Sequence, residues 1–243
     1  MIKTILGFGW LAVAMIILLP FAFTALILSL FELRKPMMHI IYRLAQSWAL
    51  SLIPVAGCTA EVKGKENIPK KGGVCFVSNH GGFFDIILLV AFCGRPFGFV
   101  AKKELSYVPF LNVWIYMLGG LFIDRGNARK AINTINKGVK RIKSGGGMLI
   151  FPEGHRSKGQ GLLPFHPGSL KLATQANAVI VPVAISGSYD VFEKNNRVVS
   201  ADTKISFLKP IDTASLPLED RKQILCSQIF SVIKEELEKQ EKN

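Results

Sequence analysis

Cysteine and histidine, the side chains most often found in metal centres and thiol chemistry, are scarce in this 243-residue chain. The four cysteines form no CxxC pair, and Cys75 and Cys93 lie in apolar runs where small buried thiols are common. The four histidines show no HExxH or comparable spacing. We therefore predict no metal site, and a reducing compartment fits the cysteine pattern best.

Acidic residues are also few, since 17 Asp and Glu stand against 30 Lys and Arg, giving a formal net charge of +13. Hydrophobic residues nevertheless make up 49% of the chain. An anionic membrane surface suits both features, because each Lys or Arg near it gains about 1 kcal/mol. Nucleic acid is the alternative partner, but no nucleic-acid module is present and it does not explain the apolar N-terminus. We predict membrane lipids, and not nucleic acid, as partners.

Charge is missing altogether between residues 4 and 31. A helix of about 20 apolar residues crosses the core of a bilayer, so this run is long enough to span it with tilt. Pro20 lies near its middle and is expected to kink the helix or divide it into a hairpin. A secretory signal peptide is the alternative, but its apolar core is normally much shorter. We predict a segment that stays in the membrane.

A second amphipathic run, residues 39–55, comes after a short basic break. It carries Arg43, so we expect it to lie in the membrane interface and not to cross the bilayer. The basic residues on this side predict that the globular part of the chain faces the cytoplasm. The chain is thus divided into membrane-associated helices (1–57) and a globular domain (58–243).

Short apolar runs separated by helical patterns fill the globular part. Strands buried on both faces are predicted at residues 74–78, 97–101, 121–124, 148–151 and 179–184. Residues 204–208 alternate in polarity and predict an edge strand, and helices are predicted at 128–144 and 218–239. The pattern indicates an α/β fold, a single layered domain with a central, largely buried mixed sheet flanked by helices.

The sequence SNHGGFFD, residues 78–85, comes directly after the first of these strands. On a continuous helix His80 and Asp85 would be about 140° apart. They can meet only if His80 lies in a glycine turn before the helix and Asp85 in its first turn. Such a pair can act as a general base and the group that orients it. A surface histidine beside a helix-capping aspartate is the more common outcome for an isolated pattern of this kind.

Two further segments bring charged side chains to strand ends. In FPEGHRS, residues 151–157, the guanidinium of Arg156 suits a phosphate, and Glu153 could hold its fork in position. A plain surface ion pair is the alternative. In GGLFIDR, residues 119–125, Asp124 and Arg125 would usually form a local salt bridge, or Arg125 could reach an anionic ligand. Residues 180–185 carry no reactive group and predict a core strand with a proline at a bulge or edge.

In their order and spacing, these four blocks resemble the motifs of the glycerolipid acyltransferase family that includes 1-acylglycerol-3-phosphate acyltransferases. NHGGFFD is similar to its NHxSxxD block, GGLFIDR to GxxxxDR, FPEGHRS to FPEGTRS, and VIVPVAI to its final V-P-V/I block. The resemblance covers about residues 74–186. Gly82 stands where the family usually has Ser, and His155 where it usually has Thr, which alters the polarity of the acceptor pocket.

The resemblance implies transfer of an acyl group from acyl-CoA or an acyl carrier protein to the hydroxyl of 1-acylglycerol-3-phosphate, giving phosphatidate. It implies no cofactor and no acyl-enzyme, with a lysophospholipid as acceptor. It assigns His80 as the general base and Asp85 as its partner, and it places at the substrate Lys102, Arg125, Glu153, Gly154 and Arg156. We also expect the main-chain N–H groups of Gly81 and Gly82 to stabilise an oxyanion.

Three alternatives remain open at this point. The acceptor could be another lysolipid, for example a lyso-ornithine lipid. Water could take the acyl group, which would make the chain a hydrolase. The chain could also be a non-catalytic membrane-binding protein that has kept the fold.

Overall fold

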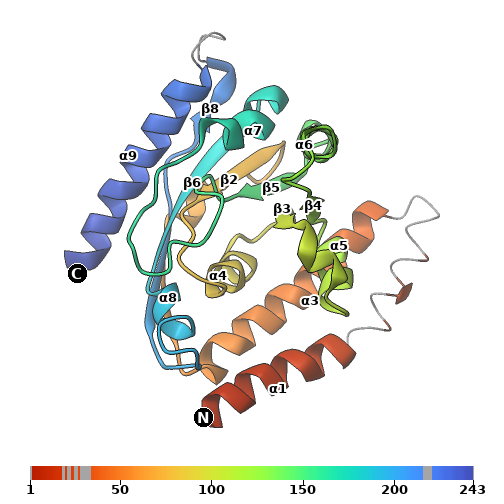
Figure 1. The fold of residues 1–243 in the computed structure, drawn as a ribbon, viewed down its shortest axis with the longest axis vertical. Coiled ribbons are helices and arrows are strands. Elements are labelled where there is room, and N and C mark those ends of the chain that lie inside the picture. Colours follow the sequence, from red (N-terminus) through yellow and green to blue (C-terminus); the bar gives the residue numbers. More distant parts are fainter. Residues whose placement is uncertain are drawn as a thin grey trace.

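The computed structural model describes residues 2–17, 20, 23, 24, 27, 34–215 and 221–242. A mixed sheet forms its centre, in the order β1-β7-β6-β2-β5-β3-β4, with β8 paired to β6 (Figure 1). Neighbouring strands are parallel, except that β6 is antiparallel to β7 and β8. The strands are β1 (Thr59–Lys63), β2 (Val74–Ser78), β3 (Phe97–Lys102), β4 (Leu121–Ile123), β5 (Gly147–Ile150), β6 (Val179–Ser186), β7 (Asp202–Phe207) and β8 (Ile211–Asp212).

Helices cover both faces of this sheet, which confirms the predicted α/β layers (Figure 1). The α-helices are α1 (Ile2–Ile17), α3 (Arg34–Val55), α4 (Phe84–Phe92), α5 (Leu111–Met117), α6 (Ala128–Lys143), α7 (Lys171–Ala176), α8 (Ser188–Val191) and α9 (Arg221–Lys242). Short 3-10 helices are η1 (Lys65–Asn67), η2 (Lys103–Tyr107), η3 (Pro167–Leu170) and η4 (Thr213–Ser215). Helices α3 and α4 pack on one face, and α6, α7 and α9 on the other.

The central strands are apolar at almost every position because each face meets a different layer. In β2, Val74 and Phe76 belong to the core beneath α3 and α4, whereas Cys75 and Val77 belong to the core beneath α6, α7 and α9. All four side chains are fully buried. This is why continuous apolar runs in the sequence predicted the interior strands correctly.

The two edges of the sheet differ from the prediction. Strand β7 is not an edge strand, because β1, which sequence patterns did not reveal, pairs with its outer side. At the opposite edge β4 is only half-buried, although it was predicted to be buried on both faces. Polarity within a strand does not reveal which neighbours pair with it. Strand β6 is the predicted core strand and is not an edge strand, and Pro182 lies where its antiparallel partner changes from β7 to β8.

The predicted helices form with small differences. Asn127 caps α6 through a hydrogen bond that its Oδ1 accepts from the Lys130 N–H (3.0 Å). Ile132 was predicted on the buried stripe of α6 but is 47% exposed. The predicted start of the last helix lies outside the described residues, and α9 continues to Lys242.

Helix α3 packs firmly against the globular part through one face. Tyr42 and Ala49 are buried in the core that α3 shares with α4, and the Tyr42 hydroxyl donates to the Val90 carbonyl (3.1 Å). Its opposite face exposes Ile40 and Leu50, which lie within the run expected at a membrane interface. The placement of α3 at a membrane interface stays a prediction, and so does a domain boundary at residue 57. Helix α3 itself packs into the same core as the sheet.

Helix α1 lies along α3 (Figure 1), and the Trp10 indole N–H donates to the Ser51 hydroxyl (3.0 Å). The expected spanning run extends beyond α1 into residues that the structure mostly does not describe. Within the described ranges no helix combines the length and apolar character that crossing a bilayer requires.

The inner face of α3 can be tested by overpacking. Ala49 has no exposed surface, so Ala49→Leu should lower the free energy of unfolding by about 1–3 kcal/mol. The neighbouring Leu50 is 43% exposed, and Leu50→Ala should change it by no more than about 0.5 kcal/mol. Denaturant unfolding of the detergent-solubilised chain measures both, and equal effects would contradict this packing.

Candidate active site

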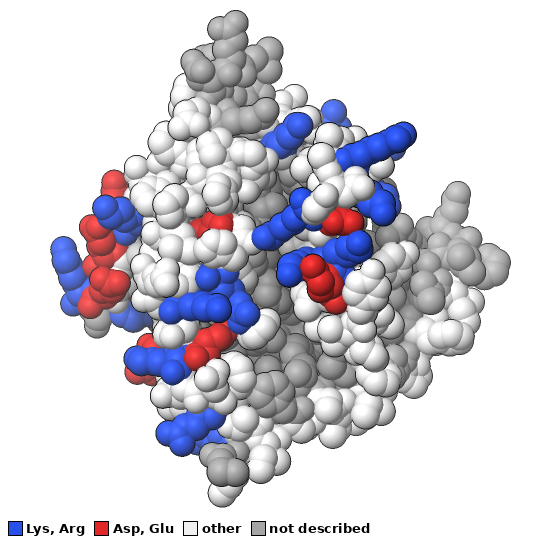
Figure 2. Space-filling view, viewed as in Figure 1, with Lys and Arg blue, Asp and Glu red and all other residues white. Residues whose placement is uncertain are grey.

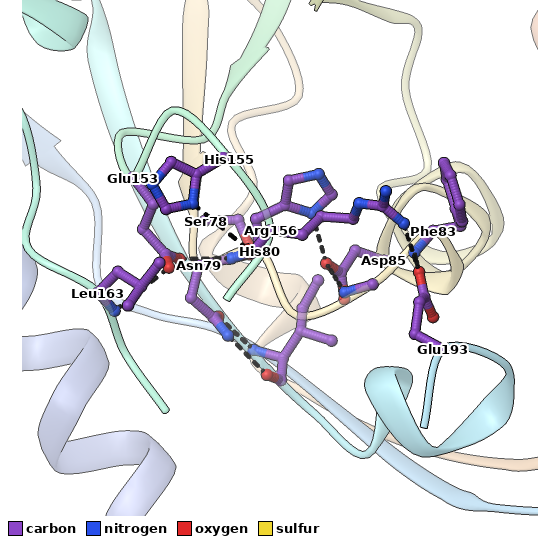
Figure 3. A network of polar contacts seen from close by, with 12 residues as sticks. Ser78, Asn79, His80, Phe83, Asp85, Glu153, His155, Arg156, Leu163 and Glu193 are labelled. Carbon is purple, nitrogen blue, oxygen red and sulfur yellow. Dashed lines mark hydrogen bonds and ion pairs between the residues drawn. The ribbon is translucent and has the colours of Figure 1, made fainter. Parts of the chain in front are cut away.

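The site lies where three neighbouring strands end. Strands β5, β2 and β6 are adjacent and parallel, so the segments after them meet at one edge of the sheet. Ligand sites in α/β proteins commonly form at this carboxyl edge. The segments are the His80 loop after β2, the FPEGHRS block after β5, and the stretch around α8 after β6 (Figure 3).

His80 and Asp85 meet, because the condition that their spacing sets is fulfilled. Helix α4 begins at Phe84, which leaves His80 in the preceding turn and Asp85 in the first helical turn. The imidazole Nδ1 lies 2.7 Å from Asp85 Oδ2, and the Asp85 side chain is fully buried (Figure 3). Because a carboxylate accepts, Nδ1 carries the hydrogen, and Nε2 is left with a lone pair. The His80 side chain keeps 17% of its surface exposed.

The FPEGHRS block holds His80 on three sides. The His80 N–H donates to Glu153 Oε1 (2.6 Å), and its carbonyl accepts from the Ser157 N–H (2.7 Å). The ring of Phe151 stacks on the imidazole, with centroids 3.9 Å apart and planes 13° apart. Both main-chain polar groups of His80 therefore bond to a segment that lies far along the chain.

Glu153 is turned toward the protein interior. Its second oxygen accepts from the Leu163 N–H (3.2 Å), and only 1% of the residue is exposed. Burial raises the pKa of Glu153 to about 7, although the N–H groups of His80 and Leu163 oppose this shift. Both oxygens are engaged by main chain, so the carboxylate positions the His80 loop; direct contact with substrate stays a prediction.

Arg156 is held by a residue that sequence patterns did not reveal. Its Nη1 lies 2.9 Å from Glu193 Oε1, and its guanidinium lies over the Phe83 ring, 3.8 Å from the centroid (Figure 3). The expectation that Glu153 holds this fork is therefore wrong. Nothing in the local sequence marks Glu193, because it lies outside the four blocks and reaches the site through the fold.

Asn79 ties the His80 loop to the end of β6. Its amide donates to the Ile185 carbonyl (2.8 Å) and accepts from the Ile185 N–H (2.9 Å), and the residue is buried. A side-chain amide that pairs with one residue's main chain in this way fixes the distance between two strand ends. The Asn of NHGGFFD thus has a structural role that its position in the block did not reveal.

The Asp124–Arg125 couple does not form the expected local salt bridge. Asp124 pairs instead with Lys103 (2.9 Å), and the hydrogen bond from this ammonium lowers the pKa of the aspartate. Arg125 is exposed, and its Nη1 lies 4.0 Å from the point where a Cβ on Gly154 would be. The structure thereby brings Arg125 beside the FPEG segment.

Lys102 is not brought to this cluster by any contact among the described residues. Its side chain is 62% exposed, and its ammonium pairs with Glu104 at 3.3 Å. Its role at a phosphate stays a prediction. In Figure 2, Lys and Arg side chains predominate around the middle of the face shown.

The oxyanion expectation is wrong for Gly82. Its N–H donates to Asp85 Oδ2 (3.1 Å), which is the oxygen that also accepts from the imidazole. This bond adds to the orientation of the aspartate and is not directed at a substrate oxygen.

Cys75 and Cys93 are buried in the two cores, as predicted. Burial raises the pKa of both thiols well above the usual range. Nucleophilic thiols are exposed and have lowered pKa values. Neither residue therefore has the surroundings of a covalent nucleophile.

A model of the family described as Acyltransferase matches residues 59–186. The 1-acyl-sn-glycerol-3-phosphate acyltransferase of Borreliella burgdorferi is 34% identical over 141 residues, which are 58% of this chain and 56% of that protein. The enzyme of that name from Saccharomyces cerevisiae is 36% identical over 170 residues (66% and 54%). The one from Escherichia coli is 32% identical over 164 residues (67% and 66%).

Among solved structures, the 1-acyl-sn-glycerophosphate acyltransferase of Thermotoga maritima superposes with a TM-score of 0.84, covering 100% of this chain and 96% of that one. At 23% identity this likeness shows the fold. The matched regions span little more than half the length of the Borreliella and yeast relatives. Since the family model covers more than half of the residues and includes all four blocks, this chain belongs to the acyltransferase family.

Proposed function

We propose that this chain transfers an acyl group from a thioester to the free hydroxyl of 1-acylglycerol-3-phosphate, giving phosphatidate in phospholipid synthesis. The observation that carries this proposal is the His80–Asp85 pair, which leaves Nε2 as a base in a partly exposed position. The names of the relatives support the choice of acceptor.

The reaction follows from the orientation of the imidazole. His80 Nε2 takes the proton of the acceptor hydroxyl while that oxygen attacks the thioester carbonyl carbon. The C–S bond then breaks, and the leaving thiolate recovers the proton from the imidazolium. Asp85 fixes the tautomer and stabilises the imidazolium. No residue is acylated, so a single base serves both proton transfers.

The acceptor's phosphate is assigned to the cationic side chains Arg125 and Arg156. Guanidinium groups match the geometry of phosphate oxygens, and both lie on loops at the carboxyl edge of the sheet. The donor is the thioester of either CoA or an acyl carrier protein.

Membrane association with the domain facing the cytoplasm is part of the proposal. Helix α1 exposes a series of apolar side chains: Ile2, Ile5, Leu6, Trp10, Val13, Ile16 and Ile17. Contiguous exposed apolar surface commonly marks an interaction site, and a net charge of +13 favours an anionic bilayer. Both features support lipid as the partner of this end of the chain.

The test is turnover by purified protein in detergent with each thioester and a panel of lysolipids, with mass spectrometry to identify the products. Phosphatidate from lysophosphatidate is the expected product. Acylation of a lyso-ornithine lipid alone would show that this lipid, and not lysophosphatidate, is the acceptor. Free fatty acid as the sole product would indicate a hydrolase. No turnover with any pair would indicate a non-catalytic membrane-binding protein.

Removal of the base is the most direct prediction. His80→Ala should lower kcat by about 10²–10⁴-fold, because positioned proton transfer typically contributes that much. A circular dichroism spectrum and unfolding midpoint like those of the wild type serve as the control for folding. Normal turnover by the folded variant would show that His80 is not the base.

Arg125 should contribute to acceptor binding. Arg125→Ala should raise the KM for lysophosphatidate about 10–100-fold, the range expected for loss of a charge-assisted hydrogen bond. The donor KM should stay the same. Arg129→Ala, an exposed arginine at the start of α6, is the matched control. Equal effects of the two substitutions would mean that only general surface charge matters.

The pKa of Glu153 predicts a pH dependence of stability. Between about pH 4.5 and 7 the folded chain keeps a proton on Glu153 that the unfolded chain has lost. The contribution of Glu153 to the free energy of unfolding is therefore largest below pH 4.5. It falls as the pH rises from 4.5 to 7, and it stays constant above pH 7. Glu153→Gln cannot titrate, so the stability of the wild type relative to this variant should decline over the same window. Denaturant unfolding at several pH values measures it, and a constant difference would contradict it.

A further inference from the structure

Glu193 links three parts of the site. It lies just after α8, and its Oε1 accepts hydrogen bonds from the Phe83 N–H (2.6 Å) and from Arg156 Nη1 (2.9 Å). Only 9% of its side chain is exposed. Phe83 directly precedes α4, the helix that carries Asp85, so a single carboxylate oxygen connects the catalytic turn with the guanidinium (Figure 3).

The other oxygen of Glu193 lies beside Gly82. Oε2 is buried without a hydrogen-bond partner among the described residues, which is costly for a carboxylate. A Cβ on Gly82 would lie 2.6 Å from Oε2 and 3.0 Å from the carboxylate carbon. The Glu193 carboxylate therefore occupies the space that a side chain at position 82 would need.

Glu193 also orients Arg156. The guanidinium is held at Nη1 by the carboxylate, and its face lies on the Phe83 ring. A guanidinium carries five N–H donors, so the contact with Glu193 leaves most of the fork for another anion. Because one edge of the guanidinium is held by Glu193, the direction of its other N–H donors is fixed. This lowers the conformational entropy that Arg156 would lose on binding an anion.

We propose that Glu193 is a positioning residue for the acceptor's phosphate, acting through Arg156, and that it does so in the space left open by Gly82. This inference rests on the proposed function for the identity of the acceptor. The pairing of Glu193 with Gly82 does not depend on it. In the motif that this chain resembles, a serine usually stands at position 82; here the Glu193 carboxylate, from a distant loop, lies beside the glycine.

Steady-state kinetics tests the positioning role. Glu193→Ala should raise the KM for lysophosphatidate about tenfold, while kcat and the donor KM change less than threefold. Glu193→Gln keeps an oxygen for the Phe83 N–H and for Arg156, so it should restore the KM to within about threefold of the wild type. Asp190→Ala is the matched control, because Asp190 lies on α8 and its carboxylate pairs with exposed Lys194 (2.9 Å), away from Arg156 and Phe83 in the interactions of the described residues. Asp190→Ala should change neither the KM values nor kcat.

Three kinetic results would overturn the positioning role. One is an unchanged acceptor KM in Glu193→Ala. Another is a loss confined to kcat, which would assign Glu193 to the catalytic turn alone. The third is an equal rise in KM for Asp190→Ala, which would reduce the effect to surface charge.

A double-mutant cycle tests the shared space without any substrate. In the wild type, Gly82→Ser should lower the free energy of unfolding, because the new Cβ meets the Glu193 carboxylate. In the Glu193→Ala background the same substitution should lower it much less. Denaturant unfolding of the four proteins measures the coupling, and additive effects would overturn the pairing. If no variant turns over lysophosphatidate but the coupling is found, the proposed function fails and the Gly82–Glu193 pairing stands.

Discussion

The site depends on the attachment of the His80 main chain to the segment after β5. A general base must stay within a fraction of an ångström of its working position, yet His80 lies in a glycine-containing turn that has little rigidity of its own. Its N–H and carbonyl are both bonded to the FPEGHRS block, and Phe151 stacks on its ring. This is possible because β2 and β5 are parallel neighbours and end at the same edge.

Three carboxylates serve this turn in different ways. Asp85 orients the imidazole, Glu153 binds the main chain of the loop, and Glu193 connects the start of α4 with Arg156. Their partners differ: among the described residues Glu153 accepts from main-chain donors, and burial raises its pKa, whereas Glu193 is paired with a guanidinium. Similar acidic side chains thus acquire separate roles through the partners that the fold provides.

The N-terminal helices are connected with the same framework. The buried face of α3 packs on α4, which carries Asp85 in its first turn and directly follows the turn that holds His80. The opposite face of α3 and the exposed surface of α1 are rich in apolar side chains. If these surfaces meet lipid as proposed, α3 is the physical link between the bilayer and the catalytic turn.

The sequence alone was enough for the interior strands, the catalytic turn and the family. Continuous apolar runs indicated the interior strands because both faces of these strands are covered, and the glycine turn before an apolar helix indicated how His80 and Asp85 could meet. The order of four blocks identified the family. These features are local in the chain, so spacing and polarity are sufficient to recognise them.

Only the tertiary structure decided which side chains from distant segments share a space. Sequence patterns did not reveal β1 or Glu193, misplaced the edge strands, and gave Glu153 the task that Glu193 performs. A carboxylate 37 residues from its arginine is brought to it by strand order and loop path, and no local pattern encodes either. The missing side chain at Gly82 can likewise be interpreted only when its neighbour is known. The Glu193 carboxylate occupies the space beside this glycine, and such packing is a property of the assembled chain.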